Sequence, residues 1–390
     1  MLPNPLKMLE LKERAVRGLE EVLGRGGVRR ALRDPHSRRV PRACGITVHP
    51  GWGCSLGCLY CYVPDMGFPP GVREYPLSGE ELAYALAANP HVIPCRTLAA
   101  VGSVTEPFLP ELVGRTLEYV KALREWLGLP TQVSTKLIPP ERVVREAVAA
   151  DPNLSVLVSA STLGMAGVLE PRAPNPLRRI GGWGEILKAV GGFRADLFLR
   201  PLIPGAVGLK DIRELLRACV KAGFGGVVAG SLRVTAGNLR RLAAAGIDVS
   251  ELLRRAGLRE PPRGRAQVPV DVRDLKEAVA REARALGLQN LPSACAANVV
   301  SHGMACWLCG WGPCGRRGEV GRLKEVLMEG LEEYVEPAVK AFGGELLGSR
   351  TAFRGGAPEA VLRVRWGGRP AVKTLSTLLS ECLKVRVRVA

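Results

Sequence analysis

The chain has 390 residues, and its hydrophobic content of 47% is enough for a sizeable buried core and excludes a disordered protein. No apolar run approaches the roughly 18 residues that a membrane-spanning helix needs, and the N-terminus lacks the uninterrupted apolar stretch of a signal peptide. We therefore expect a cytoplasmic protein that does not associate with a membrane.

Basic residues are concentrated at the two ends of the chain. The formal net charge is +18, from 55 Lys and Arg against 37 Asp and Glu. Residues 1–42 carry 11 basic and 5 acidic side chains and residues 351–390 carry 8 and 2, so each end has a net charge of +6. Such ends suit contacts with the phosphates of a nucleic acid. The alternative is an Arg-rich, thermophile-like surface that keeps the protein soluble.

Predicted helices and strands follow one another regularly along the chain. Apolar residues at helical spacing predict a helix over residues 5–23, which Gly24 ends, and a basic stretch follows over residues 25–42. Short Val-, Leu- and Ile-rich runs then predict six strands, at about residues 46–49, 98–103, 131–136, 154–161, 195–203 and 225–231. Segments with helical periodicity lie between and after them, at about residues 79–89, 111–127, 141–150, 177–190, 209–222 and 236–245.

This alternation predicts an α/β fold with a parallel sheet and right-handed crossovers. Six strand–helix units are too few for a complete eight-fold barrel, so we expect a partial (β/α)6 barrel or an open doubly wound sheet. In either fold the functional residues lie at the carboxyl ends of the strands.

The pattern changes at Pro261–Gly264, which is a plausible linker. After it we expect helices near residues 272–286 and 319–341, and then a strand–helix–strand unit at residues 360–366, 372–382 and 385–389. The predicted organisation is therefore a basic helix and arm, a partial barrel, a cysteine-rich region with helices, and a small basic α+β lobe, over residues 1–42, 43–260, 261–342 and 343–390.

Three cysteines follow the first predicted strand directly. Cys54, Cys58 and Cys61 have the spacing Cys-x3-Cys-x2-Cys. Thiolates spaced in this way on one loop can hold three irons of a cubane cluster and leave the fourth iron without a protein ligand. An open coordination position is typical of a reactive site. A zinc site is the alternative, but structural zinc takes four ligands and no fourth is nearby.

The cysteine motif resembles that of the radical S-adenosylmethionine (SAM) superfamily, in which an aromatic residue, here Tyr60, precedes the last cysteine. Further matches follow in order along the chain, at Gly102–Phe108, Ser134–Lys136, Glu170–Pro174 and Arg200–Gly205. Together they resemble the spore-photoproduct-lyase-like group, the radical DNA repair photolyases, over about residues 43–235.

The resemblance implies a partial barrel of the radical SAM type with a 4Fe-4S cluster held by Cys54, Cys58 and Cys61. SAM would bind the open iron, and its reductive cleavage would give a 5′-deoxyadenosyl radical that abstracts hydrogen from the substrate. An electron donor of the flavodoxin or ferredoxin type is then an expected partner.

The resemblance also implies that residues at the strand ends contact the cofactor. Lys136 is the candidate for the methionine carboxylate, because its ammonium is a compact point charge. The other candidates are Tyr60, Ser103, Thr105, Glu106, Ser159, Ser161 and Arg200. As alternatives, Ser103 and Thr105 could satisfy turn backbone, and Glu170 and Arg172 could form a structural ion pair.

One residue departs from the pattern of the group. The lyase that names the group has a cysteine hydrogen donor immediately before the serine that matches Ser103, and here that residue is Gly102. Repair of spore photoproduct itself is therefore not expected. The basic ends and the resemblance favour a large anionic substrate, most of all a nucleic acid. The alternatives are modification of a peptide or protein, and a non-catalytic, metal-stabilised nucleic-acid-binding protein.

A second cysteine-rich segment lies after the linker, with thiols at Cys295, Cys306, Cys309 and Cys314. Four thiolates can form a closed site, and their softness admits either a second iron–sulfur cluster or zinc. Nearby Trp307, Trp311 and Pro313 would shield a cluster from water, which favours iron–sulfur. His302 is an alternative ligand to Cys295. We expect the remaining cysteines to be plain buried thiols, namely Cys44, Cys95, Cys219 and Cys382.

Overall fold

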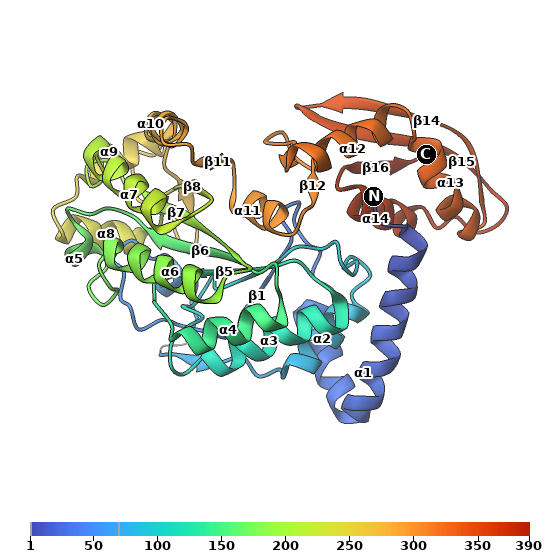
Figure 1. Ribbon diagram of the computed structural model, residues 1–390, viewed down its shortest axis with the longest axis horizontal. Helices are drawn as coiled ribbons and strands as arrows, with labels where there is room; N and C mark the ends of the chain where they lie inside the picture. The colour runs from blue at the N-terminus through green and yellow to red at the C-terminus, as the bar shows by residue number, and fades with distance from the viewer. Residues whose placement is uncertain (1, 69–70) are drawn as a thin grey trace.

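The computed structural model describes residues 2–68 and 71–390 and places a seven-stranded parallel sheet at the centre of the molecule (Figure 1). In spatial order its strands are β1 (Ile46–Val48), β4 (Ala99–Val101), β5 (Thr131–Thr135), β6 (Ser155–Ala160), β7 (Arg194–Leu202), β8 (Gly226–Ser231) and β11 (Gln289–Leu291). The first six confirm the predicted strands. The seventh was missed because its three residues, Gln-Asn-Leu, form no apolar run.

Helices cover the convex side of this sheet. They are α2 (Gly79–Ala88), α3 (Val113–Leu127), α4 (Glu141–Ala150), α6 (Pro176–Val190), α7 (Leu209–Ala222) and α10 (Arg273–Ala285). All six were predicted, and the Ser78–Glu81 capping box that begins α2 is formed. Shorter helices continue the crossovers, at α5 (Ala166–Leu169), α8 (Ala236–Ala244) and α9 (Val249–Arg255).

The two faces of each strand have different partners. Val156, Val158 and Leu197 belong to the core beneath the helices, whereas Leu157 and Phe198 pack with helix α11 (Ala294–Ser301) on the opposite, concave face. This alternation follows from the two-residue period of a strand.

Helix α11 closes the concave face at the amino ends of the strands. The Asn298 amide donates to the carbonyls of Ala99 and Pro130, at 3.2 and 3.0 Å, and the Gln132 amide donates to the Ala294 carbonyl at 2.9 Å. The carboxyl ends of the strands lie at the other edge of the sheet. Residues that follow α11 are therefore separated from residues that follow β1 by the length of the strands.

The N-terminal helix α1 (Pro5–Arg33) packs along α2. Gly24 breaks its geometry, with φ of 57° and ψ of −178°, but the chain resumes a helix after it. The predicted end at Gly24 is thus a kink, and the segment predicted as a basic arm begins as a helix. It is held there by Arg30, whose Nε donates to Glu81 of α2 at 2.7 Å.

The C-terminal residues form a lobe with its own core (Figure 1). Its elements are α12 (Arg317–Met328), α13 (Leu331–Ala341), β14 (Gly344–Arg354), β15 (Ala357–Trp366), α14 (Val372–Leu383) and β16 (Arg386–Val389). The strand–helix–strand unit is confirmed. The single helix predicted over residues 319–341 is two helices. The strand β14 was missed because its residues, none of which is fully buried, form no apolar run and no strict alternation.

The remaining elements are short. They are β2 (Gly51–Trp52), β3 (Arg73–Glu74), β9 (Arg233–Val234), β10 (Val268–Pro269), β12 (Ala305–Cys306), β13 (Cys314–Gly315) and the 3-10 turns η1 (Pro35–Ser37) and η2 (Val63–Met66).

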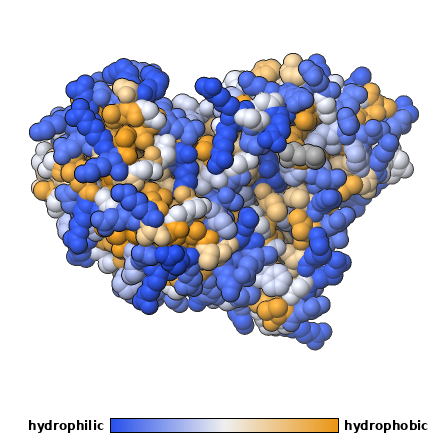
Figure 2. Space-filling model, viewed as in Figure 1, coloured by the Kyte–Doolittle hydropathy of each residue, from blue (hydrophilic) through white to orange (hydrophobic). Residues whose placement is uncertain are grey.

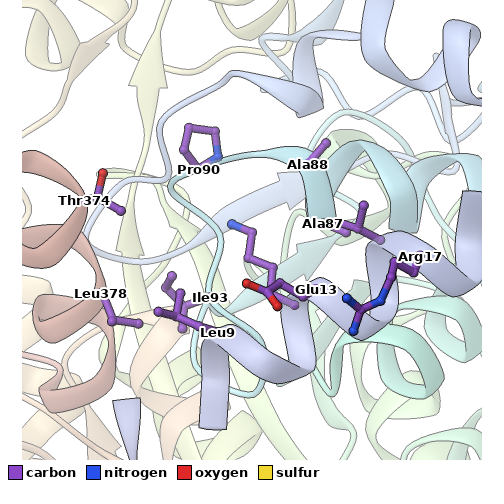
Figure 3. A pocket seen from close by; sticks show the side chains of 11 residues that line it. Leu9, Glu13, Arg17, Ala87, Ala88, Pro90, Ile93, Thr374 and Leu378 are labelled. Atoms are coloured by element: carbon purple, nitrogen blue, oxygen red, sulfur yellow. The ribbon is translucent and has the colours of Figure 1, made fainter. Parts of the chain in front are cut away.

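Helix α1 also joins the barrel to the C-terminal lobe. A cavity of about 420 Å³ lies between α1, the end of α2 and α14 (Figure 3). Beside it the Lys12 ammonium donates to the carbonyls of Asn89 and Val92, at 2.5 and 2.7 Å. On the face shown in Figure 2, hydrophilic residues cover most of both lobes, and apolar patches lie among these residues.

Candidate functional site

The first cysteine segment lies at the carboxyl end of β1, as predicted. Cys54 is exposed, and Cys58 and Cys61 are partly buried. Burial raises the pKa of all three thiols, that of Cys58 to about 12, while the ammonium of Lys136 acts on each in the opposite sense. Repulsion from Cys61 also raises the pKa of Cys54, and repulsion from Cys54 and Cys61 raises the pKa of Cys58. The charge of Lys136 therefore favours the thiolate form of all three cysteines.

Side chains from distant elements hold the backbone of this loop. Four of them donate to its carbonyls: Thr105 to Gly53, Arg172 to Ser55 at 2.8 Å, Asn238 to Tyr60 at 3.1 Å, and Arg241 to Leu59 and Cys61 at 3.1 and 2.5 Å. A second pairing keeps Arg241 in place, because its guanidinium lies 3.1 Å from the Asp65 carboxylate. The loop is thus oriented before any cofactor binds, as a ligand-bearing loop should be.

The turn that precedes Cys54 requires glycine. Gly53 has φ of 78°, and a Cβ there would lie 2.0 Å from the Gly71 carbonyl oxygen. Both the conformation and the close approach exclude a side chain.

Tyr60 anchors the loop to a buried polar network. Its hydroxyl donates to Glu170, whose carboxylate also accepts from Ser161 at 3.0 Å and pairs with Arg179. Burial would raise the pKa of Glu170, but the charges of Lys136 and Arg179 and these hydrogen bonds hold it below its usual value. The alternative in which Glu170 pairs with Arg172 is wrong. Arg179, the fourth residue of α6, takes the carboxylate, and Arg172 contacts the cysteine loop instead.

Glu106 positions the loop that carries Lys136. Its carboxylate accepts from the Thr135 hydroxyl at 2.6 Å and from the Lys136 backbone N–H at 2.7 Å. Burial raises the pKa of this carboxyl. Its oxygens are therefore engaged within the protein, as are the hydroxyls of Thr105 and Ser161.

Three candidate residues present polar groups at this edge of the sheet. Ser103 is exposed, and Lys136 and Arg200 are partly buried. The Lys136 ammonium lies over the Tyr60 ring, 5.7 Å from its centre. Within residues 2–68 and 71–390, neither Lys136 nor Arg200 has a carboxylate in ion-pair contact. Ser159 also ends a strand on this side but is buried.

The donor set of the first segment suits an iron–sulfur cluster. Three soft thiols on one preorganised loop, with a cation among them to offset thiolate charge, are the ligands that such clusters take. In the part of the chain that the structure describes, no group of three or more His, Cys, Asp or Glu side chains is arranged to hold a single metal ion.

Comparison with solved structures places the fold. A mutant of spore photoproduct lyase matches with a TM-score of 0.53 and 13% identity, over 63% of this chain and 74% of that one. A mutant with bound AdoMet and dinucleoside spore photoproduct matches with a TM-score of 0.52 and 12% identity, over 63% and 74%. The lyase complexed with dinucleoside spore photoproduct matches with a TM-score of 0.50 and 13% identity, over 62% and 73%.

The chain shares the fold of spore photoproduct lyase. This confirms the predicted fold class, a partial barrel of the radical SAM type, and it confirms the predicted resemblance at the level of fold. No protein-family model and no curated protein matches the chain. Among the described helices, none has the length and apolar character to cross a membrane.

The second cysteine segment lies at the opposite end of β1 from the first. Cys306 and Cys314 are backbone partners in the antiparallel β12–β13 hairpin. Together with Cys295 they pack around Leu98, which precedes β4. The C-terminal lobe contacts this segment, since the Trp307 backbone N–H donates to the Lys384 carbonyl at 2.7 Å. In Figure 1, α11 and β12 lie between the barrel and this lobe.

Cys44, predicted to be a plain buried thiol, is exposed and belongs to this second group. Interaction with the Cys295 thiol lowers the pKa of Cys44. Sequence reasoning missed it because residue 44 lies more than 250 positions before Cys295. Its place immediately before β1 was the available signal, since that is where the amino ends of the strands meet.

His302 is not positioned as a ligand in place of Cys295. Its two ring nitrogens contact the Asn298 carbonyl at 3.0 Å and the Asp151 carboxylate at 3.1 Å. The alternative ligand set is therefore wrong, and His302 instead ties α11 to the segment before β6.

Proposed function

We propose that this chain is a radical SAM enzyme whose substrate is a nucleic acid. The observation that carries the proposal is the three-thiol loop at the carboxyl end of β1 in the fold of spore photoproduct lyase. Beside this loop lies the ammonium of Lys136, which has no carboxylate in ion-pair contact among the described residues. Fold alone does not specify chemistry, so the argument depends on these residues.

In the proposed site, Cys54, Cys58 and Cys61 hold a 4Fe-4S cluster. When bound, such a cluster supplies the single electron that cleaves the sulfonium of SAM and yields a 5′-deoxyadenosyl radical. The ammonium of Lys136 pairs with the carboxylate of SAM, and the exposed hydroxyl of Ser103 lies where the amino group or ribose would bind. A flavodoxin- or ferredoxin-like protein delivers the electron.

The residues around the loop keep its geometry. The Tyr60–Glu170–Arg179 network fixes the aromatic ring between the cysteines and the core, and Glu106 fixes the backbone of Lys136. Buried charged groups that are paired in this way move little. A radical reaction requires its binding groups to keep a fixed geometry.

Two observations support a nucleic acid as substrate. The basic ends of the chain suit phosphate contacts, and a solved mutant of spore photoproduct lyase holds dinucleoside spore photoproduct. The reaction on this chain's substrate differs from that of the lyase. Gly102 has φ of 94°, and a side chain there would come within 2.7 Å of the Ser134 carbonyl, so no thiol can be carried at this position without a shift.

For the second segment we propose an iron–sulfur cluster held by Cys295, Cys306, Cys309 and Cys314, with zinc as the other outcome of metal analysis. Its place at the amino ends of the strands keeps it away from the proposed substrate. The role that fits this position is to tie the C-terminal lobe to the barrel or to relay electrons.

The test is anaerobic reconstitution with iron and sulfide, followed by dithionite and SAM and quantification of 5′-deoxyadenosine. Parallel reactions contain no substrate, total RNA, sheared DNA or a cell-extract protein fraction. Cys58→Ala is the inactive variant, and Cys219→Ala, which removes a thiol in the helix core, is its matched control.

Formation of 5′-deoxyadenosine by the wild type and Cys219→Ala, but not by Cys58→Ala, supports the radical assignment. Stimulation by RNA or DNA supports the nucleic-acid substrate, and stimulation by the protein fraction alone replaces it with a peptide or protein. A loaded first cluster that binds SAM but forms no product contradicts the proposal and favours a non-catalytic binding protein.

A further inference from the structure

Arg200 lies on the concave face of the sheet and is partly buried. On β7, Leu197 and Leu199 enter the core beneath the helices, so Phe198 and Arg200 face the other side. The guanidinium lies over the Phe198 ring, 5.4 Å from its centre. The stem lies against Gly230 of β8, where an added Cβ would come within 2.6 Å of Arg200 Cδ.

The other arginine on this face of β7 provides a contrast. Arg194 donates to both carboxylate oxygens of Asp196, at 2.7 and 2.8 Å. The guanidinium of Arg200 makes no such pair with any residue that the structure describes. Its charged and titratable neighbours are Tyr62 and Arg233, and burial together with Arg233 lowers its pKa. A partly buried cation without a counter-ion is costly, and a bound anion would remove that cost.

We propose that Arg200 binds a phosphate group of the nucleic-acid substrate next to the nucleotide that reacts. This inference rests on the proposed function and specifies how its site recognises the substrate. The planar guanidinium donates to two phosphate oxygens at once, which an ammonium cannot do. Tyr62 follows Cys61 directly, so the anion would bind at the border of the cysteine loop.

The SAM carboxylate is the other anion that this face must accept. Lys136 is better placed for it, because its ammonium lies 5.7 Å from the ring centre of Tyr60, which sits between Cys58 and Cys61 in the loop, whereas the Arg200 guanidinium lies over Phe198 of β7. The two cations thus have separate anions, with the cofactor at Lys136 and the substrate at Arg200.

The test measures binding of a fluorescently labelled single-stranded oligonucleotide to the reconstituted full-length protein, by anisotropy at several salt concentrations. Arg200→Met should weaken binding about ten- to hundredfold, the loss expected for hydrogen bonds to a charged group. The slope of log affinity against log salt should fall by about 1. Gly230→Ala should weaken binding in the same direction, because it displaces the arginine.

The matched control is Arg213→Met, which removes the same charge from α7, where Arg213 pairs with Glu282 at 3.0 Å. It should leave the affinity unchanged. A further arm uses the wild-type protein, so that no variant has to fold. In this arm single phosphates of the oligonucleotide are replaced by neutral methylphosphonates. For the wild type, replacement at one position should weaken binding as much as Arg200→Met does. For Arg200→Met, the same replacement should cause no further loss of affinity.

Unchanged oligonucleotide affinity in Arg200→Met overturns the inference. So does a selective loss of SAM binding, which would assign Arg200 to the cofactor. Binding of an acidic peptide by a wild-type protein that does not bind the oligonucleotide would also overturn it. These results are distinguishable from failure of the proposed function. Absence of 5′-deoxyadenosine contradicts the radical assignment whether or not the oligonucleotide binds.

Discussion

The two cysteine-rich segments lie at opposite ends of the same strand and are held in different ways. Cys44 precedes β1 and Cys54 follows it. The backbone of the first segment accepts hydrogen bonds from side chains of later elements, such as Arg241 and Asn238 of α8. The second segment is held by apolar packing around Leu98 and by its contact with the C-terminal lobe. Hydrogen bonds fix direction, which a reactive site needs, whereas apolar packing mainly joins parts of a molecule.

The largest expected effect comes from removing the anchor of the first segment. Glu170→Ala leaves Arg179 buried without its carboxylate and should lower the free energy of unfolding by about 3–5 kcal/mol. Glu170→Gln keeps the shape and should restore only part of this loss. Denaturant unfolding measures both, with Glu141→Ala, which breaks an exposed pair with Arg145, as the control expected to change little.

The Glu170 carboxylate also sets a pH dependence. Its pKa is lower in the folded protein than in the unfolded chain, so its contribution is complete above the ordinary glutamate value and is lost as the pH falls through the folded value. The wild type should therefore lose more stability than Glu170→Gln when the pH is lowered below about 4. Parallel curves for the two proteins would show that the network does not hold the carboxylate ionised.

The residues of the first segment that sequence could predict are those with a local pattern. Cys54, Cys58, Cys61 and Tyr60 form a short motif after an apolar strand, and the strands themselves are apolar runs because both faces of the sheet are covered. Arg179, Asn238 and Arg241 could not be predicted, because their partners are set by the packing of helices. Arg241, for example, lies 180 positions from Cys61.

The second segment shows the same limit. Its four thiols stand out in the sequence, but the tertiary fold brings Cys44 to them and turns His302 away toward Asp151. β11 and β14 escaped prediction for a related reason. Their residues are too polar or too exposed to give a strand pattern, and their pairing partners, β8 and β15, hold them in the sheets.

A smaller loss is expected at the junction of α11 with the barrel. His302→Ala removes the ring that contacts Asp151, a carboxylate with no exposed surface, and should cost about 1–3 kcal/mol of unfolding free energy. Because His302 is not a ligand, the metal content of the second segment should stay unchanged. Loss of one metal equivalent together with little loss of stability would reverse this interpretation of His302.

Gly53→Ala is a more local change in the first segment. A left-handed backbone costs a residue with a Cβ roughly 1–2 kcal/mol, and the contact with the Gly71 carbonyl adds to it. We expect the iron bound at the first segment to fall while metal at the second segment is retained, as measured by iron analysis of each variant. Gly164→Ala, at an open position, is the control. Equal losses at both segments would mean that the two sites are not independent.

The smallest expected effect is a difference in the alkylation rate of the Cys44 thiol, with no change in stability. This difference decides whether Cys44 belongs to the second segment. In metal-depleted protein the lowered pKa of Cys44 makes it a thiolate at pH 7, so iodoacetamide should alkylate it ahead of Cys95, whose pKa burial raises. The rate should fall as the pH drops below about 6, where the thiol is protonated. Reconstitution with metal should protect Cys44 if its sulfur joins Cys295 at the site, and mass spectrometry of the labelled peptides measures this. Alkylation at the same rate with and without metal would leave the second segment with the four thiols apparent in the sequence and Cys44 outside it.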